Sequence, residues 1–526
     1  MKNILNIWGG GQLMAFSGVD GKTDYENGLV LRSSFKTTAL DVKIPGNAEI
    51  FFSTEKPSQL YLSGDVFSMG FEDNSVRGAF LDAFHLLIDG KCEIRNEDEK
   101  IRILSKGNKT LLGTAAFFRP ELLDADISEA IEKRNSWIDK ILKGRKKKGA
   151  FYKAVSQTKT QVYSPEGTIK HRWTTPDRWP HRQIWLWDSV FHAIGIRHLD
   201  ASLAQDAILA VSDVQCEDGL IPLCASPYGK SAVTQPPVLA LGTKLVNEMK
   251  PDKNFIKELY PKLKNYLEWD MKNRDTDSDG LLEWHIAQHV NCRSGESGMD
   301  NSPRFDAALN LGATDFNSMI ALECEIMAEF AEELNFTEDI AYWQGKHKEL
   351  CSLMNRYFWD TKSGFYYDWN NSSRSRTDVM ASSGFLPLIC GAATQEQAKI
   401  LAGHIKNPET FGTELPVASI AKCCGKYYQK DMWRGPVWVN INWLIAMGFR
   451  RYGMNEISRY IIEKTTGEIE KYYDINGTLF EFFDDRREIP PPELLRKGKC
   501  APEISPTHQA LSDYGWTASL YIDMRT

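Results

Sequence analysis

The sequence predicts a mainly α-helical protein in which a closed double layer of helices follows a small β-rich N-terminal domain. Three observations predict this fold. The chain has 526 residues, which exceeds the size at which one hydrophobic core stops growing, so two domains are expected. Short β-type runs fill residues 1–125, whereas a helical period begins at Asp126 and continues through residues 126–526. We find no fixed repeat length in the helical part, which argues against a solenoid.

Residues 1–125 are expected to form a sheet or a sandwich. Runs at 49–53, 59–63 and 100–104 carry β-forming residues, and turn-prone pieces separate them. The glycine run at 9–11 is not a phosphate-binding loop, because no Lys-Ser/Thr follows it and no strand-to-helix pattern surrounds it. We predict no chemistry in this domain.

Residues 126–526 are expected to hold about a dozen helices. An apolar stripe from Ile127 to Leu142 predicts a helix that joins the two domains. The loops further along are long and rich in Trp, and long ordered loops in a compact domain are usually functional. The clearest helices are predicted at 187–199, 202–215, 254–273, 315–335, 337–358, 393–405, 438–453, 454–471 and 507–523.

Composition and charge limit the function classes. The chain is 42% hydrophobic and 25% charged, which is ordinary globular usage, and its net charge of −7 argues against a nucleic-acid partner. The basic run at 144–149 is expected to be a solvated helix end. The ten Cys are scattered without CxxC or zinc spacing, which favours reduced thiols. With no signal-peptide core and no membrane-spanning stretch, we expect a cytoplasmic protein, or a periplasmic one if a leader has been removed.

The stretch 295–306 (GESGMDNSPRFD) is the strongest candidate for a functional site. It is a predicted loop that carries three carboxylates, Glu296, Asp300 and Asp306, next to Arg304. Trp284 lies shortly upstream. Several acids beside one Arg and an aromatic residue indicate a site and not a linker. Arg304 is expected to be held in a structural ion pair.

A second candidate lies at 171–188, where four Trp fall close together and end in Trp187-Asp188. Sugars present apolar C–H faces and hydroxyl edges, so their pockets need flat aromatic rings and carboxylates that accept paired hydrogen bonds. These Trp could instead pack between helices, and Asp188 could cap the next helix. We favour packing for most of the four Trp and the site for Trp187 and Asp188.

Further pocket candidates come from three short stretches. Gln235 precedes two prolines and could bond a hydroxyl, although a plain loop explains it better. Trp433 and Arg434 precede a Gly-Pro turn that can direct them inward. Trp516 could close the pocket from the last helix. The motifs hold nine of the 15 Trp, and this clustering favours an aromatic-walled carbohydrate pocket.

Glu481 lies between aromatic pairs in the stretch 476–485. A carboxylate among Phe side chains must be paired or have a raised pKa, which is typical of functional sites. Alternatively, Glu481 points to solvent from a short strand whose neighbours point inward. The residues alone leave both readings open.

Acids at alternate positions suggest a calcium site. Asp275, Asp277 and Asp279 precede Gly280 as in the first half of a calcium loop, but the twelfth position is Ile286, so the stretch is not an EF-hand. With Glu283 they could hold a structural Ca²⁺. A solvated turn explains them equally well.

Together these motifs resemble glycoside hydrolase family 63, in particular its mannosylglycerate and glucosylglycerate hydrolases and its processing α-glucosidases. The resemblance implies an (α/α)6 barrel, or six-hairpin toroid, at 126–526, inversion of configuration and no catalytic metal or other cofactor. It implies Asp300 as general acid and Glu481 as general base. The matching stretches, in the family's order, are 185–189 (WLWDS), 235–237 (QPP), 296–304 (ESGMDNSPR), 433–438 (WRGPVW) and 480–481 (FE). The residues expected to contact or orient the sugar are Trp187, Asp188, Gln235, Trp284, Glu296, Asn301, Trp433, Arg434, Trp438 and Trp516.

The predicted function is exo-hydrolysis of an α-linked glucosyl or mannosyl unit from a small glycoside or oligosaccharide. As the proton donor, Asp300 should have a raised pKa, while Glu481 activates a water on the opposite face of the sugar. A trehalase-like enzyme or a disaccharide phosphorylase on the same barrel is the first alternative, and a non-catalytic carbohydrate-binding protein is the second. The sequence does not specify the sugar, aglycone, linkage or oligomeric state.

Overall fold

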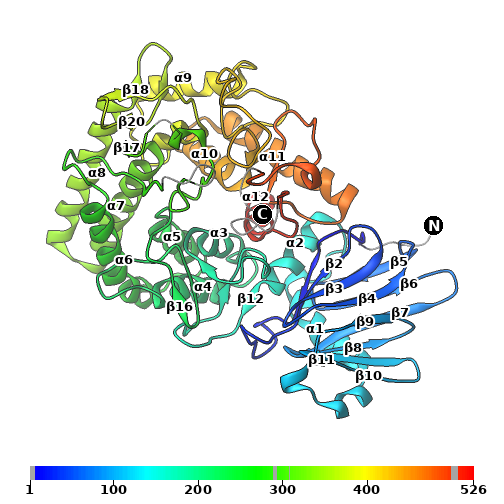
Figure 1. Cartoon of the computed structure of the whole chain (residues 1–526). Coiled ribbons are helices and arrows are strands. Elements are labelled where there is room, and N and C mark those ends of the chain that lie inside the picture. Colours follow the sequence, from blue (N-terminus) through cyan, green and yellow to red (C-terminus); the bar gives the residue numbers. More distant parts are fainter. Residues whose placement is uncertain (1–5, 288–292, 307, 499–507) are drawn as a thin grey trace.

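The computed structural model describes residues 6–287, 293–306, 308–498 and 508–526. A β-rich part formed by the start of the chain lies beside a larger helical part (Figure 1). The predicted helix-rich fold with a β-rich N-terminal region is therefore confirmed. The predicted strands at 49–53, 59–63 and 100–104 are also present, as β4, β5 and β10.

The β-rich part is a pair of antiparallel sheets with the strand orders β1-β2-β3-β4-β9 and β10-β11-β8-β7-β6-β5. Alternate side chains of both sheets meet in one core, for example Leu40 and Ile50 from the first sheet and Phe67 and Leu86 from the second. This alternation is the pattern of a sandwich. The strands are β1 (Leu13–Ala15), β2 (Val30–Ser33), β3 (Thr38–Ile44), β4 (Ala48–Ser53), β5 (Gln59–Leu62), β6 (Val66–Gly70), β7 (Ser75–Asp82), β8 (His85–Asp89), β9 (Glu93–Asn96), β10 (Ile101–Lys106) and β11 (Lys109–Thr114).

The helical part consists of α-helices, short 3₁₀ turns and two- or three-residue strands. The α-helices are α1 (Ile127–Leu142), α2 (Gly149–Thr160), α3 (Leu186–Ile196), α4 (Ala201–Asp213), α5 (Leu239–Met249), α6 (Lys253–Asn273), α7 (Thr314–Leu334), α8 (Thr337–Tyr357), α9 (Gln395–Lys406), α10 (Val439–Arg451), α11 (Asn455–Asn476) and α12 (Gly515–Arg525). Its 3₁₀ turns are η3 (Pro303–Phe305), η4 (Ser382–Leu388) and η5 (Pro491–Glu493), while η1 (Ala115–Phe117) and η2 (Pro120–Asp124) follow β11 at the end of the β-rich part. The short strands are β12 (Val162–Tyr163), β13 (Trp173–Thr174), β14 (Ile184–Trp185), β15 (Cys224–Ser226), β16 (Gly229–Lys230), β17 (Leu311–Gly312), β18 (Trp359–Asp360), β19 (Phe365–Tyr366), β20 (Trp369–Asn370), β21 (Ser375–Arg376), β22 (Val437–Trp438) and β23 (Phe482–Phe483).

Contacts between neighbouring helices form a closed cycle. It runs through α3, α5, α7, η4 and α10 to α12, which packs against α3 again. A second set packs on these from outside: α4 on α3, α6 on α5, α8 on α7, α11 on α10 and α2 on α12. In Figure 1, α3, α5, α10 and α12 lie towards the middle, while α6 and α8 lie at the periphery. The loops that lead into the inner helices are therefore brought near one another.

The last helix starts later than predicted. The sequence pattern places it at 507–523, but α12 begins at Gly515, and residue 507 lies outside the described residues. The backbone between them pairs with the segment around Glu481 instead: the N–H of Glu481 donates to the carbonyl of Leu511 (2.9 Å), and the N–H of Tyr514 donates to that of Leu479 (3.1 Å). Residues 508–514 are therefore not helical, because backbone hydrogen bonds to a distant segment replace the helical ones that the sequence pattern predicts.

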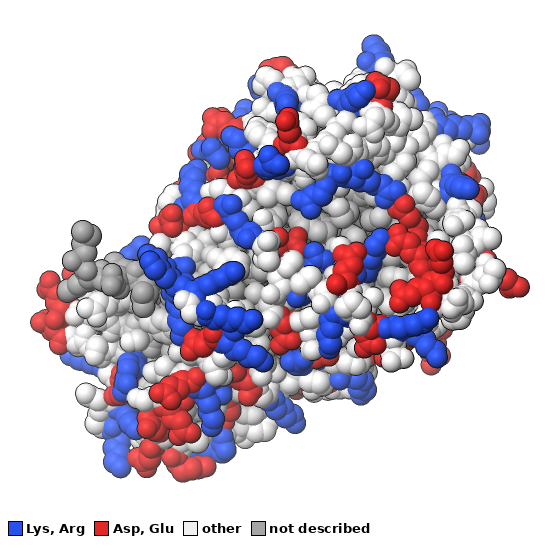
Figure 2. Space-filling view, turned by 180° about the vertical axis from the view of Figure 1, so that it is seen from behind, with Lys and Arg blue, Asp and Glu red and all other residues white. Residues whose placement is uncertain are grey.

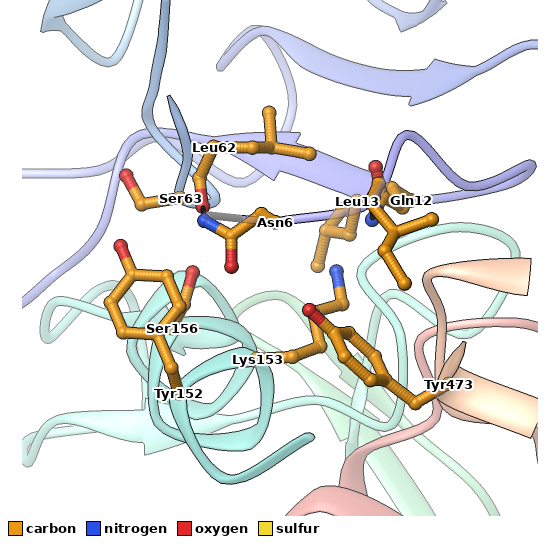
Figure 3. A pocket seen from close by; sticks show the side chains of 10 residues that line it. Asn6, Gln12, Leu13, Leu62, Ser63, Tyr152, Lys153, Ser156 and Tyr473 are labelled. Carbon is orange, nitrogen blue, oxygen red and sulfur yellow. Dashed lines mark hydrogen bonds between the residues drawn. The ribbon is translucent and has the colours of Figure 1, made fainter. Parts of the chain in front are cut away.

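The β-rich part is fastened to the helical part through Asp513. One of its carboxylate oxygens accepts from the N–H of Leu13 in β1 (2.8 Å) and from the Lys153 ammonium of α2 (2.7 Å). The other accepts from the hydroxyl of Thr478 (2.6 Å). Figure 3 shows the small pocket at this junction, where Lys153 and Tyr473 face Gln12 and Leu13. The first strand is therefore tied to the loop that leads into α12.

Three features relate to the predicted partners and cellular location: the surface charges, the hydropathy of the helices and the state of the cysteines. Figure 2 shows acidic and basic side chains interspersed on one face, with a group of Lys and Arg near the junction of the two parts. Among the described residues, none of the helices is long and apolar enough to cross a lipid bilayer. The cysteines that the structure describes are free thiols.

Candidate active site

A pocket opens where the loops before the inner helices converge. Its empty space, including the open mouth, is about 610 Å³. Segments distant in sequence contribute to it, from the start of α3, the loop 295–306, the end of the loop before α10 and the loops on either side of η5. The lining residues are His181, Trp185, Trp187, Asp188, Leu223, Gln235, Gly295, Gly298, Asp300, Met432, Trp438, Glu481, Arg496, Lys497, Tyr514 and Trp516.

One wall of the pocket is aromatic. The Trp516 ring meets Trp187 edge-on at 5.5 Å between centroids, Trp438 at 5.6 Å and Tyr514 at 4.7 Å. The indole N–H of Trp516 is buried and finds no acceptor among the described protein atoms, and the same holds for Trp185. Buried donors of this kind need water or a ligand as acceptor. The wall thus combines flat apolar faces with N–H groups suited to hydroxyls.

Asp188 and Gln235 lie on the same side of the pocket. Asp188 is in the first turn of α3 and 2% exposed, and it accepts a long hydrogen bond from the Tyr514 hydroxyl (3.4 Å). Burial raises its pKa well above the usual value, and the charge of Glu481 raises it further. The side-chain oxygen (Oε1) of Gln235 accepts from the N–H of Trp187 (3.0 Å), which ties this loop to the start of α3. The N-cap residue of α3 is Trp185, so the alternative in which Asp188 caps this helix is excluded.

Glu481 is buried and paired, which excludes the reading that it points to solvent. It immediately precedes β23 and is 1% exposed. The Nε of Arg496 donates to both carboxylate oxygens, at 3.2 and 2.8 Å, and the N–H of Leu511 donates at 3.3 Å. Burial lowers the pKa of the Arg496 guanidinium, but Glu481, with a smaller effect of Asp300, outweighs this and raises it. These donors satisfy the buried carboxylate of Glu481 and fix its orientation.

Asp300 reaches the pocket from the loop 295–306. One of its carboxylate oxygens lies 2.5 Å from the Lys497 ammonium. The loop passes close to the aromatic wall, because a Cβ added to Gly298 would lie 2.3 Å from the Trp187 ring. Gly298 also has φ +69°, a conformation that favours glycine. Glycine at this position therefore allows the close approach that brings Asp300 into the pocket.

The loop 295–306 is held by buried ion pairs. The Arg304 guanidinium is fully buried and bonds both oxygens of Asp315 (2.7 and 2.8 Å) and of Asp368 (2.7 and 2.9 Å). The expected structural role of Arg304 is thus confirmed. Glu296 bonds the Arg274 guanidinium at 2.6 Å and accepts two backbone N–H groups. Trp284 donates to Asp315 (3.0 Å) and stacks on Phe316 at 3.8 Å.

A second set of contacts joins this loop to the segment 431–434. The side-chain oxygen of Asn301 accepts from the N–H of Trp433 (2.9 Å), and its amide donates to the Asp431 carbonyl (3.3 Å). Arg434 donates to both oxygens of Asp306 (2.8 Å each). Trp433 stacks on Trp438 with centroids 3.8 Å apart and planes 2° from parallel.

The predicted site residues therefore fall into two groups. Those that the structure brings together in the pocket lining are Trp187, Asp188, Gln235, Asp300, Trp438, Glu481 and Trp516. Those that lie outside the lining and support it are Trp284, Glu296, Asn301, Trp433 and Arg434.

Sequence reasoning missed several lining residues. His181 and Trp185 lie within the Trp-rich stretch, so that motif contained a signal for them. His181 pairs with Asp177 (2.9 Å) and lies 3.3 Å from the Arg496 guanidinium. Arg496 and Lys497 follow a proline-rich stretch without periodicity. The signal for them in the sequence is weak: they are two adjacent cations, and the two predicted catalytic carboxylates, Asp300 and Glu481, would each need a cationic partner if buried.

The four carboxylates of the candidate calcium site lie together. One oxygen from each of Asp275, Asp277, Asp279 and Glu283 lies within 4.8 Å of the others. Burial raises the pKa of Glu283 to about 7, and the hydrogen bonds from Thr276 oppose this. Carboxylate oxygens are the ligands that Ca²⁺ prefers, so the donor set fits this ion. The ion itself stays a prediction.

A pocket walled by indoles, with carboxyl groups brought in by separate loops at one end of a double layer of helices, is typical of a glycosidase. Residues 181–488 match the family described as the mannosylglycerate hydrolase MGH1-like glycoside hydrolase domain. The chain belongs to this family, within glycoside hydrolase family 63, and is therefore a glycosidase. The match leaves the β-rich part outside it.

Individual relatives agree with this assignment. The mannosylglycerate hydrolase of Thermus thermophilus is 25% identical over 386 residues, covering 57% of this chain and 91% of the relative. The cytosolic neutral trehalase of Saccharomyces cerevisiae is 25% identical over 257 residues, or 43% of this chain and 32% of the trehalase. The crystal structure of a GH63 mannosylglycerate hydrolase from Thermus thermophilus in complex with glucose superposes with a TM-score of 0.58 at 22% identity, covering 71% of this chain and 99% of that one. That structure supports the fold of the helical part.

Replacing Asp188 by Asn should stabilise the protein progressively as the pH rises. The folded-state pKa of Asp188 is raised, so its contribution to stability is fully present below its unfolded pKa and is lost as the pH rises through the folded value. Asn keeps the shape without the buried charge. We expect the melting temperature of the Asn variant relative to the parent to be higher at pH 8 than at pH 5. A difference that is constant or falls with pH would contradict this assignment.

Calcium should raise the melting temperature if it binds the acidic cluster. A ligand at one hundred times its dissociation constant adds about 2.7 kcal/mol to the free energy of unfolding. Thermal unfolding with calcium and with a chelator measures this, and the double variant Asp277→Asn, Asp279→Asn should lose the effect. An unchanged melting temperature of the parent in calcium would show that the cluster is a solvated turn.

Proposed function

We propose that the chain is an exo-acting, inverting glycoside hydrolase that removes an α-linked glucosyl or mannosyl unit from a small glycoside or oligosaccharide. One observation carries the proposal: Asp300 and Glu481, far apart in sequence, line the same aromatic pocket and are held by different cations. We further propose that the helical part, 126–526, is an (α/α)6 barrel. The closed cycle of inner helices, with helices packed outside it, supports this.

Glu481 acts as the general base. Arg496 and the Leu511 N–H donate to its carboxylate and fix its orientation, and this carboxylate takes a proton from the attacking water. The pocket gives that water polar partners beside the aromatic wall. Inversion requires about 6.5–9.5 Å between the two carboxyl groups, to leave room for the water.

Asp300 acts as the general acid and protonates the glycosidic oxygen. Lys497 lies against its carboxylate, and an ammonium stabilises the ionised form, whereas a proton donor must be protonated. The mechanism therefore requires that substrate binding separate Lys497 from Asp300. The released ammonium can then meet the leaving group.

The pocket recognises the terminal sugar through both of its walls. Trp187, Trp438 and Trp516 provide apolar faces. Asp188 and Gln235 provide polar atoms for the hydroxyls. The substrate is proposed to be a glycerate glycoside or a related small α-glycoside, because the Thermus relative is named a mannosylglycerate hydrolase and because Arg496 and Lys497 suit a carboxylate on the aglycone.

The residues behind the lining orient it. Trp284, Glu296 and Asn301 hold the Asp300 loop, and Trp433 supports Trp438 from behind. Arg434, paired with Asp306, joins the Asp300 loop to the segment before α10. No metal or other cofactor takes part in this proposal. The free thiols fit the cytoplasmic location that we propose.

Two other functions remain as alternatives to be tested. A trehalase-like activity is supported by the similarity to the yeast trehalase over 43% of this chain. A disaccharide phosphorylase would use phosphate in place of the Glu481-activated water, so its turnover would depend on phosphate. The second alternative drawn from the sequence, a non-catalytic sugar-binding protein, is contradicted by membership of a glycosidase family.

Asp300→Asn and Glu481→Gln should each lower turnover by at least about 10²- to 10⁴-fold, the usual contribution of general acid–base catalysis. The two variants should respond differently to the leaving group. A dinitrophenyl glycoside needs no protonation, so Asp300→Asn should regain much of its rate on it, whereas Glu481→Gln should not. Glu493→Gln, which changes an exposed carboxylate of η5 outside the lining, is the matched control. Full activity of either catalytic variant would overturn the assignment.

Inversion should be visible in the first sugar released. Proton NMR of a reaction with an α-glucoside or α-mannoside, recorded before mutarotation, should show the β-anomer. Release of the α-anomer would mean retention, which requires a nucleophile only about 5–5.5 Å from the acid. Released monosaccharide from trehalose and from glycerate glycosides, with and without phosphate, separates the alternatives.

A further inference from the structure

A second recess, larger than the active-site pocket, lies between the β-rich part and the helical part. Its empty space is about 1190 Å³, against about 610 Å³ for the pocket by the same measure. We call it the interdomain groove. It is lined by Gly11, Arg32, Ser33, Ser34, Phe35, Lys36, Asp41, Lys43, Trp179, Pro180, Pro492, Gln509, Ala510, Leu511 and Ser512.

The groove and the active-site pocket share two wall segments. In the first, Trp179 and Pro180 face the groove, and His181 lines the pocket. In the second, Leu511 lines the groove while its backbone N–H donates to Glu481, and Tyr514 lines the pocket. A ligand in the groove would therefore contact Leu511, whose backbone N–H donates to the proposed base Glu481.

An exposed aromatic ring is held in place at the groove. Phe35, between β2 and β3, is 63% exposed. Its ring rests on the glycine run, since a Cβ added to Gly10 would lie 2.1 Å from the ring and one on Gly11 would lie 3.2 Å from it. The glycines at 9–11 therefore make room for an aromatic platform. The ring therefore presents a flat apolar face at a fixed place in the groove lining.

A second aromatic ring, that of Trp179, also lines the groove. Trp179 packs against the small core of Leu13, Val30 and Ile44, and the Lys43 ammonium lies 5.3 Å from its ring centroid. Lys43 is paired with Asp41 at 3.2 Å. The groove thus offers two aromatic faces, a neutralised ion pair and the exposed Gln509 amide.

Arg32 fixes the relative position of these walls. It is 6% exposed, and its guanidinium donates to four carbonyls, those of Gly11 (2.7 Å), Ser512 (3.2 Å), Asp177 (2.6 Å) and Trp179 (2.7 Å). These carbonyls belong to the β-rich part and to both shared wall segments. The groove is therefore a built feature with fixed walls.

We propose that the interdomain groove is a second carbohydrate-binding site, which holds sugar units of a neutral α-linked oligosaccharide. Aromatic faces suit the apolar faces of pyranose rings, and the Asp41–Lys43 pair and Gln509 suit their hydroxyls. Of the lining cations, Arg32 is buried against four carbonyls and Lys43 is paired with Asp41, while Lys36 is exposed and can donate to a hydroxyl. The choice of a sugar rests on the proposed function, because the groove shares its walls with the pocket of a glycosidase.

Calorimetric titration with maltotetraose and with an α-linked mannotetraose tests the proposal. The titrated protein is the full chain carrying Asp300→Asn, so that the tetrasaccharides are not hydrolysed during the titration. The unaltered chain is used instead if it does not hydrolyse them. Adding Phe35→Ala or Trp179→Ala should weaken tetrasaccharide binding by about tenfold or more, which corresponds to roughly 1.4 kcal/mol. Phe35→Tyr should keep the affinity. Phe117→Ala, at another exposed ring of the β-rich part, is the matched control.

The outcomes separate this proposal from the proposed function. In the unaltered chain, Phe35→Ala should leave hydrolysis of a nitrophenyl α-glycoside and binding of glucose or mannose unchanged. Equal tetrasaccharide affinity in Phe35→Ala and its parent would overturn the groove proposal, even where hydrolysis is normal. A change from dimer to monomer in sedimentation, without a change in sugar binding, would overturn it in favour of a subunit interface. Absence of any hydrolysis would contradict the proposed function alone.

Discussion

The ion pair between Glu481 and Arg496 is the interaction on which the pocket depends. A carboxylate that is 1% exposed among Phe side chains would be very costly to ionise without a partner. Arg496 supplies that partner and is itself buried. Removal of one member of such a pair leaves an unpaired buried charge and usually costs about 3–5 kcal/mol. The chain around η5 brings this guanidinium to Glu481 and so allows a buried carboxylate to lie near the aromatic wall.

The same principle organises the loops around the pocket. Arg304 between Asp315 and Asp368, and Arg274 against Glu296, fasten the Asp300 loop to the helical scaffold. These pairs are made by planar guanidinium groups, which match carboxylates with two parallel hydrogen bonds. The loop can therefore be long and still present Asp300 at a defined place. A functional loop positioned by a rigid scaffold is the usual arrangement in enzymes.

The sequence was informative where a residue's chemistry is local. The Asp300 loop was a candidate because several acids stand together there beside a Trp, whereas the residues around Glu481 left two readings open and the family resemblance selected it. Both residues line the pocket. The pattern cannot say which way a loop aromatic points, so Trp433, which stacks behind the lining, looks the same as an indole that meets a ligand. Arg496 carries no periodicity, and its role exists only once the fold brings it to Glu481. The start of α12 was misplaced for the same reason, because residues 511–514 find their backbone partners in a distant segment, and local propensity is a weak predictor there.

The β-rich part cannot be treated as an independent attachment. Leu13 of β1 donates to Asp513, one residue before Tyr514 of the pocket. Arg32 of β2 donates to Ser512, one residue after the Leu511 that donates to Glu481. Each of these hydrogen bonds from the β-rich part therefore ends within one residue of a group that touches the pocket. Because the 511–514 segment has backbone donors and acceptors divided between the two parts, any shift of the β-rich part must move the support of Glu481 as well. The two parts are thus joined at the segment that supports Glu481, and the interdomain groove is lined by Leu511 and Ser512 of the same segment.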